Sequence, residues 1–278
     1  MINDGGKLVS VQNLQAIKSN HSDINKSLRN ISSGYRVQHA ADDPAGLSVS
    51  KKMDSDARAL KQAMRNTNDG VALIQRAEGS LNVMTDILVR LREITVAASN
   101  GTITSLDRGA MDTEYTNLIG EMQNIITNSV FNRRNILNSG GQLAIQIGFE
   151  NNSESRLEIN LDALNSTLGG LNITARVQSL NNGGGGFDGS AIKILDDAIT
   201  EIGSRRAYVG ALQNRLDKTL GNMMEQHGQL TYSSSQIVDT DYATESSELT
   251  KNQIINQAGV AAAGQAKTIY QSIMSILS

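Results

Sequence analysis

The chain has 278 residues, a formal net charge of −3, no cysteine, no tryptophan and only three phenylalanines. Without cysteine it can form neither disulfides nor thiolate metal sites, and without a basic excess it offers no electrostatic reason to bind nucleic acid. Because aromatic side chains are so scarce, a core must be built from aliphatic residues, which suits long, thin helices better than a globular interior.

The first predicted element is an amphipathic helix near the N-terminus. Its partner-facing positions recur at alternating three- and four-residue steps: Leu14, Ile17, His21, Ile24, Leu28 and Ile31. This spacing is typical of a helix that packs against another helix. We expect Gly34 to end it, because glycine tolerates the left-handed backbone found at many helix C-termini.

The stretch HAADDPAG, residues 39–46, contains two adjacent carboxylates, a histidine and the only proline of the chain. It could be a catalytic pair beside a general base, or a corner between two helices. Paired catalytic carboxylates usually need opposite sides of a substrate or very different environments. Asp43, in contrast, is a good N-cap, and Pro44 suits the first helical position. We therefore favour the corner, followed by a helix that reaches about Ser99 and is about 80 Å long.

The middle of the chain changes its periodicity twice. A third helix is expected over about residues 105–129, and alternating apolar residues then predict a β-hairpin at about 142–162. After a Gly-rich connection at 181–189, helical spacing returns over 192–237. A final amphipathic helix carries Ile255, Ile269, Ile273 and Ile276. Neither terminal helix can cover its own apolar residues, so the two need each other or another copy of the chain.

No combination of residues predicts a catalytic, cofactor or metal site. The three histidines, His21, His39 and His227, form no H-E-x-x-H pattern. The run GGGG at 183–186 lacks the Lys-Ser/Thr ending of a phosphate-binding loop. No apolar run approaches the roughly 20 residues that span a bilayer. We expect no enzyme activity, no cofactor and no membrane insertion.

Several stretches resemble bacterial flagellin in the same order. SLRNISSGYRVQHAADDPAGLSVS resembles the N-terminal signature of that family, and RNTNDGVALIQRAEGSLN and LVRLREITVAASNGT continue it. At the other end, GALQNRLDKTL, SSSQIVDTDYATESSELTKNQI and QAGVAAAGQA resemble the C-terminal signature. Together with VFNRRNIL, these cover nearly the whole chain except a stretch between the hairpin and the Gly-rich connection.

The resemblance implies a mainly α fold: a long antiparallel helical coiled-coil rod with one small β-hairpin and with the N- and C-terminal helices paired. Residues 1–40 together with 240–278 would form an inner coiled-coil domain, and residues 41–239 a helical bundle that carries the hairpin. Two connecting corners, or spokes, would join these layers. The spoke residues are Asp42, Asp43, Pro44, Gly46, Asp239 and Asp241.

The chain also departs from the family at three places, one of which is its opening, MINDGGKLVS, where the family usually has Ile-Asn-x-Asn/His. Only the short Gly/Asn-rich connection stands where many flagellins carry large outer domains, which predicts a thin, comparatively smooth filament. After Phe131 and Asn132, Arg133 and Arg134 replace a frequent glycine, which predicts a different loop there.

By this resemblance the protein is a secreted, extracellular structural subunit that self-assembles as a homopolymer into the helical flagellar filament and serves swimming motility. Its partners would be other copies, a flagellar export chaperone, the type III export apparatus, and filament cap and hook-associated proteins. The alternative from the same signatures is a hook–filament junction protein. A secreted enzyme on this scaffold is disfavoured, because the metalloprotease motif of some relatives is missing.

A last expectation concerns host recognition. The segment VRLREI, residues 89–94, resembles the part of flagellin that an innate immune receptor binds. Arg90 matches the family's key arginine, Glu114 matches an acidic contact, and Ile94 stands where leucine is usual. The alternative is that these residues only line a helix face that is buried in the filament.

Overall fold

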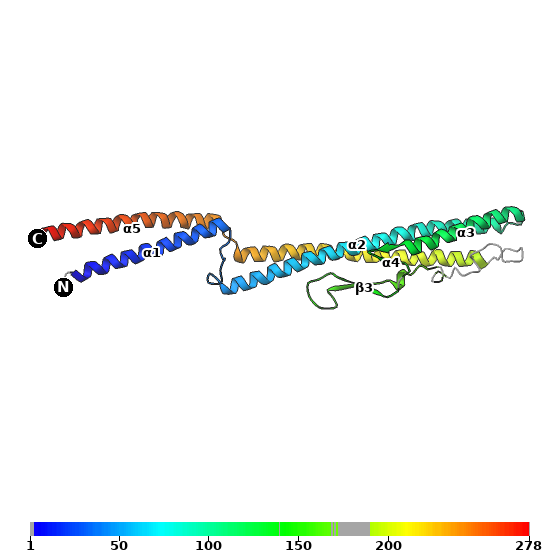
Figure 1. Ribbon diagram of the computed structural model, residues 1–278, viewed down its shortest axis with the longest axis horizontal. Helices are drawn as coiled ribbons and strands as arrows, with labels where there is room; N and C mark the ends of the chain where they lie inside the picture. The colour runs from blue at the N-terminus through cyan, green and yellow to red at the C-terminus, as the bar shows by residue number, and fades with distance from the viewer. Residues whose placement is uncertain (1–2, 139, 168, 170, 172–189, 278) are drawn as a thin grey trace. The chain divides into compact units, whose positions relative to one another are not determined.

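A computed structural model describes the backbone of residues 3–277 except 139, 168, 170 and 172–189, and most side chains between Asn13 and Ile269. In this part of the chain the main elements are the helices α1 (Asn3–Ser33), α2 (Pro44–Ala98), α3 (Ser105–Asn128), α4 (Ser190–Val238) and α5 (Tyr242–Leu277) (Figure 1). The helices predicted from periodicity are confirmed, with α2 ending one residue before Ser99. The fold is mainly α, as expected.

The chain divides into two compact units. Unit 1 combines the two ends, residues 1–57 and 228–278, and unit 2 is the continuous stretch 58–227. Both α2 and α4 contribute residues to each unit. The inner and outer layers, with boundaries after residues 40 and 239, remain a prediction.

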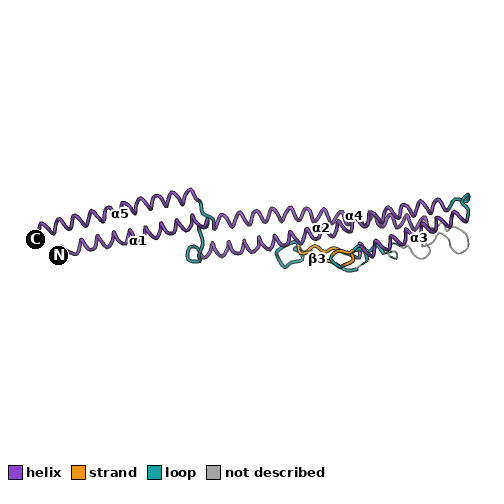
Figure 2. The backbone as a smooth tube through the Cα atoms, turned by 45° about the horizontal axis from the view of Figure 1, so that its top comes forward, coloured by secondary structure: helices purple, strands orange, loops and turns teal. Residues whose placement is uncertain are grey.

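Unit 2 is a bundle of α2, α3 and α4 with an aliphatic core (Figure 2). Its large, fully buried side chains include Leu60, Leu81, Met84, Leu88, Leu91, Tyr115, Met122, Ile126, Ile136 and Ile159. Tyr115 is the one aromatic residue in this group, as the composition led us to expect. Burying each such side chain contributes roughly 1.5–3 kcal/mol. Unit 2 therefore has a core that does not depend on the terminal helices.

The predicted hairpin is present in unit 2. The strands β3 (Gln142–Gln146) and β4 (Arg156–Asn160) pair in antiparallel register, so that Ile145 lies opposite Leu157. Both of these side chains are buried. Ile145 packs against α2 at Gly70, where an added Cβ would lie 2.5 Å from the isoleucine Cδ1. The glycine thus leaves room for the hairpin to dock.

A second antiparallel ribbon, β1 (Val130–Phe131) with β2 (Arg134–Asn135), was not predicted. The two residues that connect its strands both have positive φ, 45° at Asn132 and 65° at Arg133. A two-residue turn of this kind favours Asn-Gly, because a side chain in the left-handed region costs about 1–2 kcal/mol. The arginine that replaces the frequent glycine therefore occupies a strained position.

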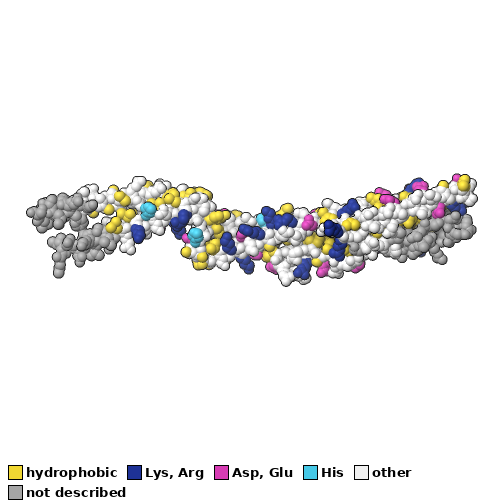
Figure 3. All heavy atoms as spheres, in the orientation of Figure 1, with side chains coloured by type: hydrophobic (Ala, Val, Ile, Leu, Met, Phe, Trp, Pro, Cys, Tyr) yellow, Lys and Arg dark blue, Asp and Glu magenta, His cyan; other side chains and the backbone are white. Residues whose placement is uncertain are grey.

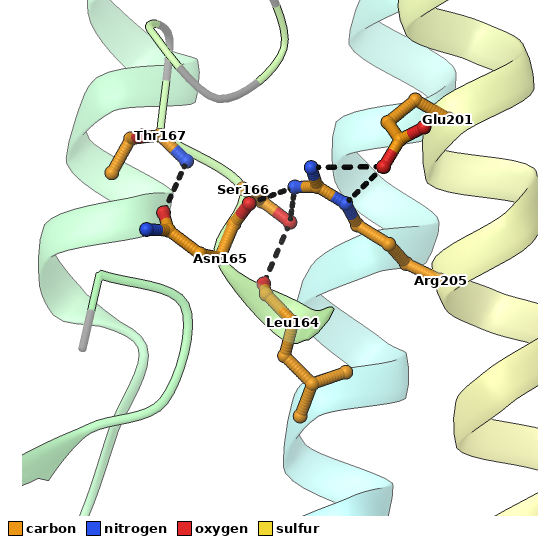
Figure 4. A network of polar contacts seen from close by, with 6 residues as sticks. All are labelled: Leu164, Asn165, Ser166, Thr167, Glu201 and Arg205. Atoms are coloured by element: carbon orange, nitrogen blue, oxygen red, sulfur yellow. Dashed lines mark hydrogen bonds and ion pairs between the residues drawn. The ribbon is translucent and has the colours of Figure 1, made fainter. Parts of the chain in front are cut away.

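Arg205 of α4 forms hydrogen bonds with the segment after β4 and so holds it against the bundle (Figure 4). Its side chain is 8% exposed, and Nη1 donates to the Asn165 carbonyl oxygen and, at 2.9 Å, to the Ser166 hydroxyl. Nη2 pairs with Glu201 at 3.1 Å, one turn earlier on the same helix. The Ser166 hydroxyl in turn donates to the Leu164 carbonyl oxygen. The buried cation is thus surrounded by acceptors.

We predict that Arg205→Ala lowers the free energy of unfolding by roughly 2–3 kcal/mol, because it leaves buried acceptors without a donor. Arg206→Ala is the matched control: the neighbouring arginine is exposed, and its loss should change stability by less than about 0.5 kcal/mol. Urea unfolding followed by circular dichroism measures both. Equal effects of the two substitutions would show that the buried contacts contribute no stability.

Candidate assembly interface

The terminal helices α1 and α5 lie side by side and run in opposite directions (Figures 1 and 2). Gly259 lies against Ile17, because a Cβ added at this glycine would be 3.3 Å from the isoleucine Cγ1. Asn20 Nδ2 donates to the backbone carbonyl oxygen of Asn252 at 3.0 Å. These contacts establish the pairing of the N- and C-terminal helices within one chain.

The contact face of each helix follows from the burial of its side chains. On α1 the less exposed positions include Ile17, Asn20, Ile24, Ser27 and Ile31. On α5 they are Glu245, Leu249, Asn252, Asn256, Gly259, Ala263 and Ala266. Both rows advance by three and four residues, which is the pattern of a coiled coil. As far as its side chains are described, the α5 row contains one large apolar residue, Leu249, among polar and small ones.

Polar residues weaken this interior. Asn20 is 9% exposed, and Ser27 and Asn30 are buried as well. The Nδ2 of Asn256 is buried without a hydrogen-bond partner, and such a group costs about 1–3 kcal/mol. In its described part, the contact between α1 and α5 therefore places polar side chains and one unpaired buried group beside the isoleucines of α1, and we expect the isolated pair to be weak.

The predicted partner-facing residues coincide with this face only in part. Three of them lie on it: Ile17, Ile24 and Ile31. Four others are between 46% and 63% exposed: Leu14, Leu28, Ile255 and Ile269. His21 is also exposed and hydrogen-bonds Asn25 on its own helix. Ile273 and Ile276 belong to the end of α5, where only the backbone is described. Their joint role as an assembly interface stays a prediction.

Large apolar side chains are thus exposed to solvent on the terminal helices. Figure 3 shows hydrophobic side chains, in yellow, on the described part of these helices. To the four residues above, α5 adds Ile254 and Val260, which are 61% and 55% exposed. We call these six residues the terminal apolar surface. Apolar area gains about 25 cal/mol per Å² when it leaves water. The described part of the chain leaves this surface uncovered.

The first corner is built by two carboxylates with separate partners. Asp42 Oδ2 accepts the backbone N–H groups of Gln38, at 3.2 Å, and His39, at 3.0 Å. Asp43 Oδ1 accepts the N–H of Gly46 at 2.9 Å, and α2 begins at Pro44. The prediction of a helix corner is therefore confirmed, and both aspartates serve as backbone caps.

Gly46 is required by the same cap. A Cβ at this position would lie 2.3 Å from Asp43 Oδ2 and 3.2 Å from Cγ2 of Ile237 in α4. The capping carboxylate folds over the glycine, and α4 packs on its other side. The sequence DDPAG thus encodes a turn, an N-cap, a first helical residue and the space that the cap needs.

The second corner has a similar cap. Asp241 Oδ1 accepts the N–H of Ala243 at 2.9 Å, and Oδ2 accepts the hydroxyl of Thr244 at 2.9 Å, at the start of α5. The Asp239 carboxylate accepts the Ser235 hydroxyl, and its backbone bridges to Tyr35. The six spoke residues thus lie at helix ends or in the bridge between the two corners.

Backbone hydrogen bonds join the two corners to each other. The N–H of Thr240 donates to the Gly34 carbonyl oxygen at 2.9 Å, and the N–H of Arg36 donates to Val238 at 2.7 Å. Gly34 has φ 78°, so it ends α1 in the left-handed conformation as predicted. The hydroxyl of Tyr242 donates to the Ile31 carbonyl oxygen at 3.0 Å. The terminal pair is therefore anchored at its corner end.

The candidate receptor residues differ in their exposure. Arg90 of α2 pairs with Glu114 of α3 at 2.7 Å and with Glu93 at 3.1 Å, and all three side chains are about half exposed. The two carboxylates raise the pKa of Arg90, mainly through the hydrogen bond to Glu114. Ile94 is 4% exposed and belongs to the core. In this fold Ile94 is therefore not accessible to a receptor.

Two other kinds of site are absent from the described residues. No group of three or more His, Asp or Glu side chains is arranged to hold a metal ion. None of the described helical segments is both long and apolar enough to cross a membrane.

We predict that Gly46→Ala destabilises the protein by about 1 kcal/mol, because the new Cβ displaces the capping carboxylate of Asp43. Gly79→Ala is the control on the same helix, since its Cβ would meet nothing within 4 Å. That substitution should stabilise by about 1 kcal/mol through helix propensity. Thermal unfolding measures both changes, and shifts of the same sign would contradict the role assigned to Gly46.

Acid should loosen both corners. Hydrogen bonds from the backbone N–H groups of His39 and Gln38 lower the pKa of Asp42. The pKa of Asp241 is lowered mainly by the hydrogen bond from the Thr244 side-chain hydroxyl, and also by the one from the Ala243 backbone N–H. A carboxyl whose pKa is lower in the folded state stabilises that state above its ordinary pKa of 3.8 and loses this contribution as the pH falls through the lowered value.

We therefore expect the amides of His39 and Ala243 to exchange faster relative to the rest of the helices once the pH drops below 3.8. Replacing Asp42 and Asp241 together by Asn should make this protection nearly independent of pH in the same range. Hydrogen exchange read by mass spectrometry measures the difference. Identical acid profiles for the wild type and the double variant would refute the assignment.

Comparison with known proteins places these features in one family. The helical region typical of the N-terminus of bacterial flagellin matches residues 7–141, and the C-terminal helical region of flagellin matches residues 192–277. The flagellin of Halalkalibacterium halodurans is 34% identical over 256 residues, which is 91% of each chain. The flagellar filament core protein flaB2 of Brachyspira hyodysenteriae is 33% identical and covers 100% of this chain and 99% of its own.

A solved structure from Vibrio parahaemolyticus, of a protein thought to be flagellar hook-associated, has a TM-score of 0.57 and 16% identity, and covers 71% of this chain and 100% of that one. At this identity the likeness concerns the fold alone. The family matches and the relatives, in contrast, extend over nearly the whole sequence. The chain belongs to the bacterial flagellin family.

Proposed function

We infer that this chain is a structural subunit of the bacterial flagellar filament, which it builds by self-assembly and which serves swimming motility. The observation that carries this inference is the terminal apolar surface, which the chain's own helices leave uncovered. A polymer of identical copies covers such a surface on every subunit except those at its ends. The similarity to a flagellin and to a filament core protein over most of the chain supports the same function.

Assembly by this route requires contacts between different surfaces of successive copies. Heterologous contacts build open helical polymers when their rotation does not close into a ring, whereas a self-complementary contact is satisfied within a dimer. The terminal pair is weak alone, so its ordering is coupled to the addition of each subunit, and apolar burial between copies offsets the loss of conformational entropy. In this proposal residues 1–40 with 240–278 form the inner layer of the filament, and residues 41–239 the outer bundle.

The remaining partners follow from the same proposal. A subunit of an extracellular filament has to be exported, through the type III export apparatus and with a chaperone that covers the terminal apolar surface beforehand. Hook-associated and cap proteins would bind the two ends of the polymer. A host receptor would meet Arg90 and Glu114, which are exposed on unit 2. The role is structural, and we propose no catalysis, cofactor or metal.

The alternative, a hook–filament junction protein, is not favoured. Its support is a structural likeness at 16% identity, whereas the relatives that span nearly the whole chain are filament proteins. Seeded growth separates the two functions: a filament subunit elongates purified seeds by itself, and a junction protein stays monomeric beside them.

We predict that deleting residues 250–278 abolishes filament growth and leaves a soluble helical protein, because unit 2 keeps its core. A subtler variant keeps the chain length: Ile254→Ser with Ile255→Ser removes two residues of the terminal apolar surface. Gln253→Ser with Gln257→Ser is its control, since both glutamines are exposed polar residues of the same helix. Electron microscopy and sedimentation should show filaments for the control alone. Filaments from the truncated chain would contradict the mechanism.

A further inference from the structure

The turn between α2 and α3 contains an asparagine that is followed directly by a glycine. α2 ends at Ala98 and α3 begins at Ser105, so Asn100 and Gly101 lie between the two helices, and both residues are exposed. The sequence has a second Asn-Gly pair, at 182–183, which lies outside the described residues. An Asn-Gly pair reacts with itself when the glycine nitrogen reaches the side-chain amide carbon of the asparagine.

The nitrogen of Gly101 is available for this reaction. Among the residues that the structure describes, its N–H donates no hydrogen bond, whereas the N–H of Asn100 donates to the Ala97 carbonyl oxygen at 3.1 Å. An N–H inside a helix is bonded to the preceding turn in the same way, so it is not free to act as a nucleophile. A Cβ added at Gly101 would meet nothing within 4 Å beyond its neighbours in the chain. No other part of the unit therefore crowds the glycine.

The side-chain amide of Asn100 is held over the same turn. Its Oδ1 accepts the N–H of Thr102 at 3.2 Å, and its backbone carbonyl oxygen accepts the N–H of Ile103 at 3.2 Å. The bond to Oδ1 polarises the side-chain carbonyl, and it lies where negative charge develops when a nucleophile attacks the amide carbon Cγ. The turn thus combines a polarised amide carbon with an unbonded amide nitrogen in the next residue.

We propose that Asn100 is a site of spontaneous deamidation. The Gly101 nitrogen loses its proton to the solvent and forms a bond with Cγ of Asn100. The bond between Cγ and the side-chain nitrogen breaks, and this nitrogen takes up a proton and leaves as ammonia. Water then opens the cyclic imide at either carbonyl, which gives aspartate or isoaspartate. Water is the only co-reactant, and nothing is oxidised or reduced.

Either product changes the connection between the two helices. The new carboxylate follows the C-terminus of α2, where the helix dipole makes a negative charge unfavourable. In isoaspartate the main chain runs through the former side chain, so the turn between Asn100 and Ile103 gains a backbone carbon. The reaction needs only the unassembled chain, and its test is therefore independent of the proposed filament function.

Peptide mapping by mass spectrometry tests the proposal on the folded, full-length chain incubated in neutral buffer. Cleavage after lysine and arginine places Asn100 in the fragment 93–108, apart from the second Asn-Gly pair. Conversion of Asn100 in the folded chain should be within about tenfold of the rate in this fragment as a free peptide, because an exposed turn opens at little cost in free energy. An Asn100 that stays intact while the free peptide converts would overturn the proposal.

Asn128 is the internal control. It is the last residue of α3 and is exposed, but a serine follows it. The serine side chain shields the attacking nitrogen and restricts the backbone, so Asn128 should remain intact while Asn100 converts. Equal conversion of the two asparagines would show that exposure alone decides, and would overturn the role assigned to the turn.

The substitution Gly101→Ala removes the reactive pair and leaves the fold unchanged, because the new Cβ enters open space. Conversion should slow by about tenfold or more, since the methyl group hinders the approach of the nitrogen and narrows the backbone conformations. Thr102→Ala is the matched control: it keeps the N–H that binds Oδ1, and it should convert at the wild-type rate. Circular dichroism verifies that both variants are folded. Conversion of Gly101→Ala at the wild-type rate would refute attack by the glycine nitrogen.

The pH dependence identifies the chemical route. Only the deprotonated nitrogen attacks, and far below the pKa of an amide its deprotonated fraction rises about tenfold for each pH unit. The initial rate at Asn100 should therefore increase steeply from neutral to mildly alkaline buffer and fall in mild acid, with ammonia released in equal amount. A rate that does not change with pH would overturn the proposed route.

Discussion

Several large apolar residues of the terminal helices do not face the partner helix of their own chain, and the proposed assembly depends on this fact. In the described part of the contact between α1 and α5, isoleucines of α1 meet mainly asparagine, glycine and alanine of α5, whereas Leu14, Leu28 and Ile255 are exposed to solvent. In the proposed filament, further copies would cover these residues. Unit 2, in contrast, closes its aliphatic core with its own helices. One chain therefore combines a part that can fold alone with a part that is stable in a polymer.

At the two corners, three aspartate side chains stabilise the turn and the starts of α2 and α5. Asp42, Asp43 and Asp241 each accept backbone or hydroxyl donors at a turn or a helix start, and none of them needs a counter-ion to do so. A negative charge at a helix N-terminus also interacts favourably with the helix dipole. Because the corners are joined by backbone hydrogen bonds, the terminal helices stay close at one end even where their contact is weak. That end can then act as the starting point for ordering.

Features that depend on neighbouring residues could be predicted from the sequence, whereas contacts between residues far apart in the sequence could not. The helices, the hairpin and the corner at Asp43 and Pro44 each follow from neighbouring residues, and all were predictable. The residues of α1 that face α5 were not predictable. The apolar residues of α1 cover more of its surface than one partner helix can contact, and the sequence does not show which of them make that contact. Arg205 gave no signal either, since its partner Ser166 is 39 positions away. The ribbon at Val130 was too short for any periodicity.

Apolar burial and charge pairing would have different tasks in the proposed filament. Apolar contacts are not directional, so a terminal surface that only needs to be covered does not determine how far apart successive subunits lie. Charged groups at fixed points on a rigid element do determine it.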